Sequence, residues 1–227
     1  MERVAKKTRT PPPPRRVQAP KTRTATPARR DAETRNRTIL YAAGASGLLG
    51  LAIVLIVIAF AGGNKANAAS VASAVKKAGG TFKTFPAQPR TPHYTTLPPK
   101  NPLKYNSFPP TSGRHYFQWV IWGYYTQPVN LYQEVHNLEH GGVIIQWGSK
   151  VPASDVEKIH QFWREDPNAM LAAPLPKLGN KIALTAWTHL AEFTRFDEAA
   201  FKKFRDVLRY HAPESPILPK SALNPGQ

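Results

Sequence analysis

Residues 39–61 form an unbroken run of 23 residues without a charged side chain. An α-helix rises about 1.5 Å per residue, so a helix of this length crosses the hydrocarbon core of a bilayer, which is roughly 30 Å thick. The sequence therefore predicts one transmembrane helix over residues 38–61.

The segment before this run is strongly basic. Residues 1–37 contain twelve Lys or Arg, three acidic residues and four consecutive prolines, Pro11 to Pro14. This composition cannot bury a core, and it predicts a disordered tail with polyproline II character. Because basic flanks favour the cytoplasmic side of a membrane, we expect a cytoplasmic N-terminus near anionic lipid head groups and an extracytoplasmic C-terminal part.

A cleaved signal peptide is the alternative interpretation of the same run. Ala59-Phe60-Ala61 and Ala66-Asn67-Ala68 both have the small-x-small form that signal peptidase accepts. The apolar run is longer than the usual signal-peptide core of about 7–15 residues. Its length favours an uncleaved anchor, and hence a single-pass protein of the cell membrane.

The charge distribution argues against nucleic-acid binding. Of the formal net charge of +17, the tail supplies +9, twelve minus three, and the remaining +8 is spread over 190 residues. No basic cluster interleaved with aromatic residues occurs among them. The chain also has no cysteine, which excludes disulfides, cysteine-ligated metal sites and thiol chemistry.

Composition divides the rest of the chain into three parts. Residues 62–89 are predicted to form a juxtamembrane helix, ended by Lys-Lys-Ala-Gly-Gly at residue 80, and a linker. The proline-rich stretch 81–111 should be extended and wrap around the fold without entering the interior of a sheet. Residues 90–219 are predicted to be one extracytoplasmic domain, with residues 220–227 as a C-terminal tail.

Hydrophobic spacing within this domain predicts an α+β fold, a small sheet with packed helices. Helices are expected near residues 131–140, 153–165 and 197–211, and single strands in residues 143–147, 169–175 and 181–193.

Several motifs in a fixed order resemble a known family. They are PPTSGRHY (109–116), WGYY (122–125) and HNLEHGGVII (136–145), followed by PASDVEKI, LAAP and TAWT. This combination is similar to the bacterial family known as domain of unknown function 3105, over roughly residues 93–219. Many members are membrane-anchored or exported, which the resemblance implies here too. Some relatives carry cysteines that this chain lacks, so no disulfide or cysteine ligand is carried over, and the resemblance implies no activity.

The stretch HNLEHGG, residues 136–142, places two histidines four residues apart. On a helix His136 and His140 lie about 6 Å apart on one face, which lets two imidazoles share a cation at bonds near 2.1 Å. In a strand they would be about 13 Å apart. His115 and His93 upstream complete a candidate site, with Glu139 as a ligand or orienting residue. Neutral imidazoles suit Zn²⁺ or Cu²⁺.

Two functional interpretations remain open. HNLEH fits the H-x-x-E-H motif of inverted zincins, so the chain is either a metal-dependent hydrolase using His136 and His140 with Glu139 as base, or a non-enzymatic protein. The latter would bind a divalent metal ion or a protein partner that the sequence does not identify. The predicted helix and domain are small for such a hydrolase, which favours the non-enzymatic interpretation.

A purely structural interpretation stands beside both. In it His115 and His136 hydrogen-bond to backbone in a packed loop, His140 is a partly exposed residue at a helix end, and Glu139 is solvated. His160, His189 and His211 are expected to be surface or core residues. Six aromatic residues lie within residues 116–125, and they either line a groove or, as we prefer, cover a core.

Overall fold

The computed structural model describes residues 68–215 and 217–227. The predicted basic tail and the predicted transmembrane helix over residues 38–61 lie outside this range. Within the described part of the chain, no helix is both long enough and apolar enough to span a bilayer.

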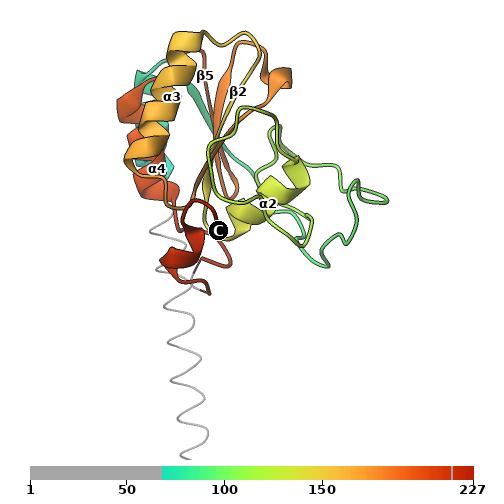
Figure 1. Ribbon diagram of the computed structural model, residues 1–227. Helices are drawn as coiled ribbons and strands as arrows, with labels where there is room; N and C mark the ends of the chain where they lie inside the picture. Colours follow the sequence, from blue (N-terminus) through green and yellow to red (C-terminus); the bar gives the residue numbers. More distant parts are fainter. Residues whose placement is uncertain (1–67, 216) are drawn as a thin grey trace, which may run out of the picture. The chain divides into compact units, whose positions relative to one another are not determined.

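One mixed sheet of five strands forms the centre of the fold, in the order β1-β5-β4-β2-β3 (Figure 1). The strands are β1 (Thr81–Thr84), β2 (Val143–Trp147), β3 (Met170–Pro174), β4 (Ile182–Ala186) and β5 (His189–Phe193). Only β2 and β3 pair in parallel, and the helix α3 (Ala153–Glu165) connects them. All other neighbours are antiparallel.

Helices cover both faces of this sheet (Figure 1). On one face α3, α4 (Glu198–Leu208) and a helix over residues 68–77 pack against the sheet, and on the other lies α2 (Leu131–Glu139) with the loops around it. Strand β2 shows why both faces are needed. Val143 and Ile145 face the α3 and α4 side, whereas Ile144 faces the α2 side, and all three are buried.

The ends of α2 follow from residues that are local in sequence. The Asn130 side chain accepts a hydrogen bond from the backbone N–H two residues on, which caps the first turn. At the other end the N–H of Gly141 donates to the carbonyl of Leu138, and that of Gly142 to the carbonyl of Asn137. This is a Schellman motif, and it requires the left-handed φ of +87° at Gly141.

The α+β prediction is confirmed, and α2, α3 and α4 lie where helices were predicted. The prediction of a single strand over residues 181–193 is wrong, because that stretch is the hairpin β4–β5. The folded unit also begins upstream of residue 90. The helix over residues 68–77 buries Val71 and Val75 in the core, and β1 adds an edge strand, so part of the predicted linker belongs to the domain.

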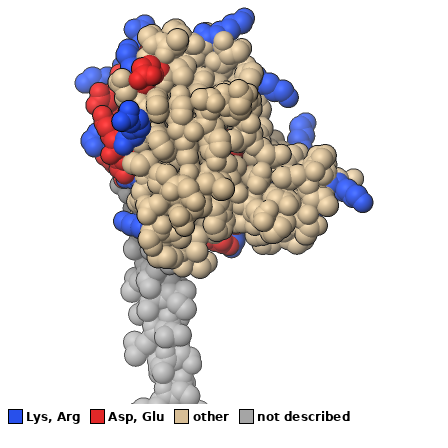
Figure 2. All heavy atoms as spheres, viewed as in Figure 1, with Lys and Arg blue, Asp and Glu red and all other residues tan. Residues whose placement is uncertain are grey.

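Charged side chains show no single basic surface in the view of Figure 2. Lys and Arg lie scattered around the edge of this face, and acidic side chains accompany them along the side where α3 and α4 lie. The absence of nucleic-acid binding stays a prediction.

Candidate metal centre

Two histidines of the candidate site lie one turn apart on α2. The rings of His136 and His140 stack, with centroids 4.7 Å apart and an interplanar angle of 28°. Nδ1 of His136 lies 3.0 Å from the carbonyl oxygen of Tyr116. A carbonyl only accepts, so Nδ1 carries the proton and Nε2 keeps its lone pair. Trp119 covers both rings edge-on.

His115 comes from the loop before α2 and is fully buried. Its Nδ1 donates to the carbonyl oxygen of Gly113 at 2.8 Å, so in the neutral ring Nε2 has the lone pair. Gly113 has a φ of +119°, and a Cβ there would lie 3.0 Å from the side chain of Leu103. The tight turn therefore needs glycine. It brings the His115 ring to 4.8 Å from that of His136.

His93 reaches the cluster through backbone pairing of two loop segments. The N–H of Tyr94 donates to the carbonyl of His115 at 2.8 Å, and that of Phe117 donates to the carbonyl of Tyr94 at 3.1 Å. The ring of His93 consequently lies 4.6 Å from that of His115 and 5.2 Å from that of His136. Its side chain is 29% exposed, so the cluster meets solvent at His93.

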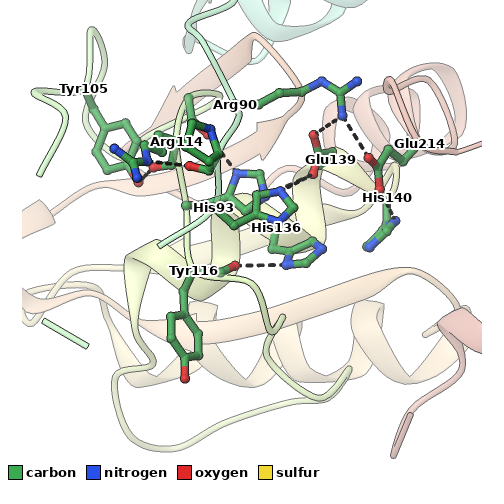
Figure 3. A network of polar contacts seen from close by, with 12 residues as sticks. Arg90, His93, Tyr105, Arg114, Tyr116, His136, Glu139, His140 and Glu214 are labelled. Atoms are coloured by element: carbon green, nitrogen blue, oxygen red, sulfur yellow. Dashed lines mark hydrogen bonds and ion pairs between the residues drawn. The ribbon is translucent and has the colours of Figure 1, made fainter. Parts of the chain in front are cut away.

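Two carboxylates join the histidines, and Arg90 holds both (Figure 3). Nη1 of Arg90 lies 2.6 Å from Oε1 of Glu139 and 2.8 Å from Oε1 of Glu214. The chain after α4 delivers Glu214, because its N–H donates to the carbonyl of Glu139 at 3.0 Å and the N–H of Tyr210 donates to that of Gly141 at 2.8 Å. Each carboxylate keeps its Oε2 for other partners.

The electrostatics of Glu139, His136 and His140 favour the protonation states that could bind a metal ion. Burial alone would raise the pKa of Glu139, but its contacts with His115 and Arg90 lower that pKa to about 2. Burial, helped by His115 and His140, lowers the pKa of His136 to about 4, and burial also lowers the pKa of His140. A carboxylate and neutral imidazoles are the forms that donate lone pairs to a cation.

Several polar atoms at the centre are buried without a hydrogen-bond partner. They are Nε2 of His93, Nε2 of His115, Oε2 of Glu139 and both ring nitrogens of His140. Oε2 of Glu139 lies 3.0 Å from Nε2 of His115. In the neutral ring with its proton on Nδ1, two lone pairs face each other there, whereas a protonated ring donates to the carboxylate and so lowers the pKa of Glu139. Leaving such atoms unpaired costs free energy, and a cation between them would remove that cost.

The candidate ligand atoms of the described residues divide into two groups of three. His93, His115 and Glu139 form the first triad, and His136, His140 and Glu214 the second, with the atoms of each triad within 4.8 Å of one another. The single site expected from the sequence is therefore two adjacent triads, with His115 in one and the α2 pair in the other.

All five residues predicted as ligands lie in this cluster, namely His93, His115, His136, His140 and Glu139. The structural interpretation is right that His115 and His136 hydrogen-bond to backbone carbonyls. It is wrong that Glu139 is solvated, since that side chain is fully buried, and wrong that His140 is partly exposed.

The other histidines lie away from the cluster's contacts, as expected. His160 stacks on Tyr124, His189 bonds to the carbonyl of Trp187, and His211 is exposed. Sequence reasoning missed Arg90 and Glu214. No motif marks either residue, because backbone contacts between distant segments bring them to the site.

The aromatic residues of 116–125 serve both purposes considered from the sequence. Trp122 is buried in the core beside α2. Phe117, Trp119 and Tyr125 instead line a surface hollow of about 670 Å³, next to Gln133 of α2. Trp119 thus separates the hollow from the histidine pair.

Comparison with known proteins assigns a family without an activity. The family described as "Protein of unknown function (DUF3105)" matches residues 96–220, more than half of the chain. Its range includes every residue of the two triads except His93. No curated protein and no solved structure matches the chain. The chain belongs to the DUF3105 family of proteins of unknown function.

Proposed function

We propose that this domain binds a divalent transition-metal ion through His93, His115 and Glu139. The observation that carries the proposal is the convergence of Nε2 of His93, Nε2 of His115 and Oε2 of Glu139, all buried and all without a hydrogen-bond partner. Two imidazoles and a carboxylate are a ligand set that suits Zn²⁺, and also Cu²⁺.

The surroundings of the three ligands support the same function. The carbonyl of Gly113 orients His115, and Arg90 orients Glu139, so these two ligands each present one particular atom to the site. Metal sites are commonly built with such orienting partners, and losing one typically weakens metal binding about 10- to 100-fold. The partial exposure of His93 gives an ion a route to the site.

The contacts of Glu139 favour binding over hydrolysis. A general base works best with a pKa near the working pH, whereas the pKa of Glu139 is about 2 and its Oε1 is held by Arg90. Its Oε2 points at His93 and His115, where it would serve as a metal ligand. We therefore assign Glu139 to the metal, and not to the base role of the inverted-zincin interpretation.

Replacing His115 with asparagine tests the metal site. The asparagine amide can still donate to the Gly113 carbonyl in place of Nδ1–H, but it has no atom at the position of Nε2. We expect the full-length protein to bind Zn²⁺ in competition with a chromophoric chelator. His115→Asn should lower the Zn²⁺ affinity of this site at least about a hundredfold, which is more than the loss of an orienting partner would cause.

His160→Asn is the matched control, because His160 stacks on Tyr124 outside the cluster. It should bind as the wild type does. Two outcomes would overturn the proposal. One is an equal affinity of the His115 and His160 variants for Zn²⁺, and the other is that the wild-type protein binds neither Zn²⁺ nor Cu²⁺. Thermal unfolding of the metal-free variants shows whether each is folded.

The same proposal places the domain outside the cytoplasm on a single-pass anchor. Its support is the uncharged run over residues 39–61 and the basic flank over residues 1–37. We expect alkaline phosphatase fused after Gln227 to be active, since that enzyme requires an oxidising compartment. This topology would be contradicted if only a reporter that works in the cytoplasm were active at this position. Release of the fusion from the membrane would indicate cleavage.

A further inference from the structure

We infer that His136, His140 and Glu214 form a second cation subsite, so that the cluster is a two-ion centre. This inference rests on the proposed function, because it takes the ligand to be the same class of divalent metal ion. It differs from that proposal in its residues, its stoichiometry and its test.

His140 is the first observation that points to a ligand. Its side chain is only 6% exposed, and both of its ring nitrogens are buried without a hydrogen-bond partner. A buried imidazole normally places at least one nitrogen on a protein or water partner. Nδ1 of His140 instead lies 3.6 Å from Oε2 of Glu214, which is too long for a hydrogen bond.

His136 and Glu214 each offer one atom to the same place. Nδ1 of His136 is used by the Tyr116 carbonyl, which leaves Nε2 as its ligand atom. Oε1 of Glu214 is used by Arg90, which leaves Oε2. Figure 3 shows His136, His140 and Glu214 around one space beside α2. Their ligand atoms lie within 4.8 Å of one another, close to the roughly 4.2 Å that two bonds of 2.1 Å can span.

One ion cannot use both triads at these positions. The ligand atoms of the described residues fall into two groups of this size and not into one. The groups are nevertheless neighbours, because the His136 ring lies 4.8 Å from that of His115 and 5.2 Å from that of His93. Two adjacent ions of this kind are an established arrangement in metalloproteins.

Arg90 explains why the carboxylates of Glu139 and Glu214 belong to different triads. Its Nη1 binds Oε1 of Glu139 and Oε1 of Glu214, so each carboxylate turns its Oε2 to a different triad. A single guanidinium therefore sets the orientation of one ligand in each subsite. The second ion enters beside a bound cation and beside Arg90, so it should bind more weakly than the first.

Counting bound Zn²⁺ in the full-length protein tests the inference. The wild type should take up two equivalents, the second more weakly, in a calorimetric titration of metal-free protein. Glu214→Gln should take up one, because the amide can still accept from Arg90 but lacks the charge of the ligand. Glu165→Gln, an exposed glutamate at the end of α3, should keep two.

His140→Phe is the second variant, and it separates a ligand from a structural residue. Phenylalanine keeps a ring of similar size against Trp119 and removes two unpaired buried nitrogens, so the metal-free protein should be at least as stable. Its Zn²⁺ count should fall from two to one. One equivalent in the wild type, unchanged in both variants, would overturn the second subsite and leave the proposed function standing. No bound Zn²⁺ or Cu²⁺ in the wild type would overturn both.

Discussion

Replacing Gly141 with alanine should lower the free energy of unfolding by about 2–5 kcal/mol. Alanine at a φ of +87° costs about 1–2 kcal/mol by itself. The added Cβ would also lie 2.8 Å from the backbone Cα of Tyr210 and would clash with Oγ of Ser215, and overpacking of this kind costs about 1–3 kcal/mol. Urea unfolding of the metal-free protein measures the change.

Gly79 provides the matched control for this substitution. It follows the helix over residues 68–77 with a φ of +76°, but no atom lies within 4 Å of the Cβ position. Gly79→Ala should therefore show the backbone cost alone, about 1–2 kcal/mol. If the two variants lost equal stability, the close approach of residues 210–215 to the end of α2 would be refuted, and with it the route by which Glu214 reaches the site.

The sequence predictions were accurate where the structure depends on contacts between residues that are close in the sequence. Asn130 caps α2 and Gly141 stops it through hydrogen bonds within a few residues. These local residues were therefore sufficient to predict the helix and the placement of His136 and His140 on one face of it. The 3.6-residue spacing of buried side chains likewise predicted α3 at its observed bounds.

Elements that depend on distant partners were not predictable in this way. β1 is only four residues long and largely exposed, and it is a strand because β5 pairs with it. The hairpin β4–β5 turns at Trp187 and Thr188, without glycine, asparagine or proline. Thr188 has a φ of +65°, a conformation that threonine rarely adopts, so the sequence contains no turn signal there.

The site divides along the same line. The histidines could be singled out because they stand in short motifs and because histidine has few roles in a packed domain. Glu214 lies 74 positions after His140, in a loop with no periodic pattern. Its own backbone bond to Glu139 and that of Tyr210 to Gly141 bring it to the site. Arg90 is similarly placed by the long arm before His93, whose path the sequence does not determine.

The second large effect that we expect is a pH dependence of the free energy of unfolding that arises from Glu134. It does not involve metal binding. The Glu134 side chain is 2% exposed on α2, and Nε2 of Gln146 in β2 lies 3.0 Å from each of its carboxyl oxygens. Burial raises the pKa of Glu134 to about 8, against a smaller lowering by the Gln146 hydrogen bond. The native state therefore holds a proton here between about pH 4.5 and pH 8, where the unfolded chain does not.

The sign of the resulting pH dependence follows from proton binding. Because the unfolded state binds fewer protons in this window, the free energy of unfolding falls as pH rises, by about 1.4 kcal/mol per pH unit. Glu134→Gln is neutral at every pH and can still accept from Gln146. The stability of this variant minus that of the wild type should therefore increase by about 4 kcal/mol from pH 5 to pH 8.

Urea unfolding of the metal-free proteins at several pH values measures this difference, and Glu157→Gln is the matched control. Glu157 also pairs with a glutamine, Gln161, but on the exposed surface of α3, so its replacement should leave the pH profile unchanged. All other titrating groups are common to the three proteins and cancel in the comparison. A difference for Glu134→Gln that stayed flat across this range would mean that the native protein carries Glu134 ionised, with its burial compensated by a partner other than Gln146.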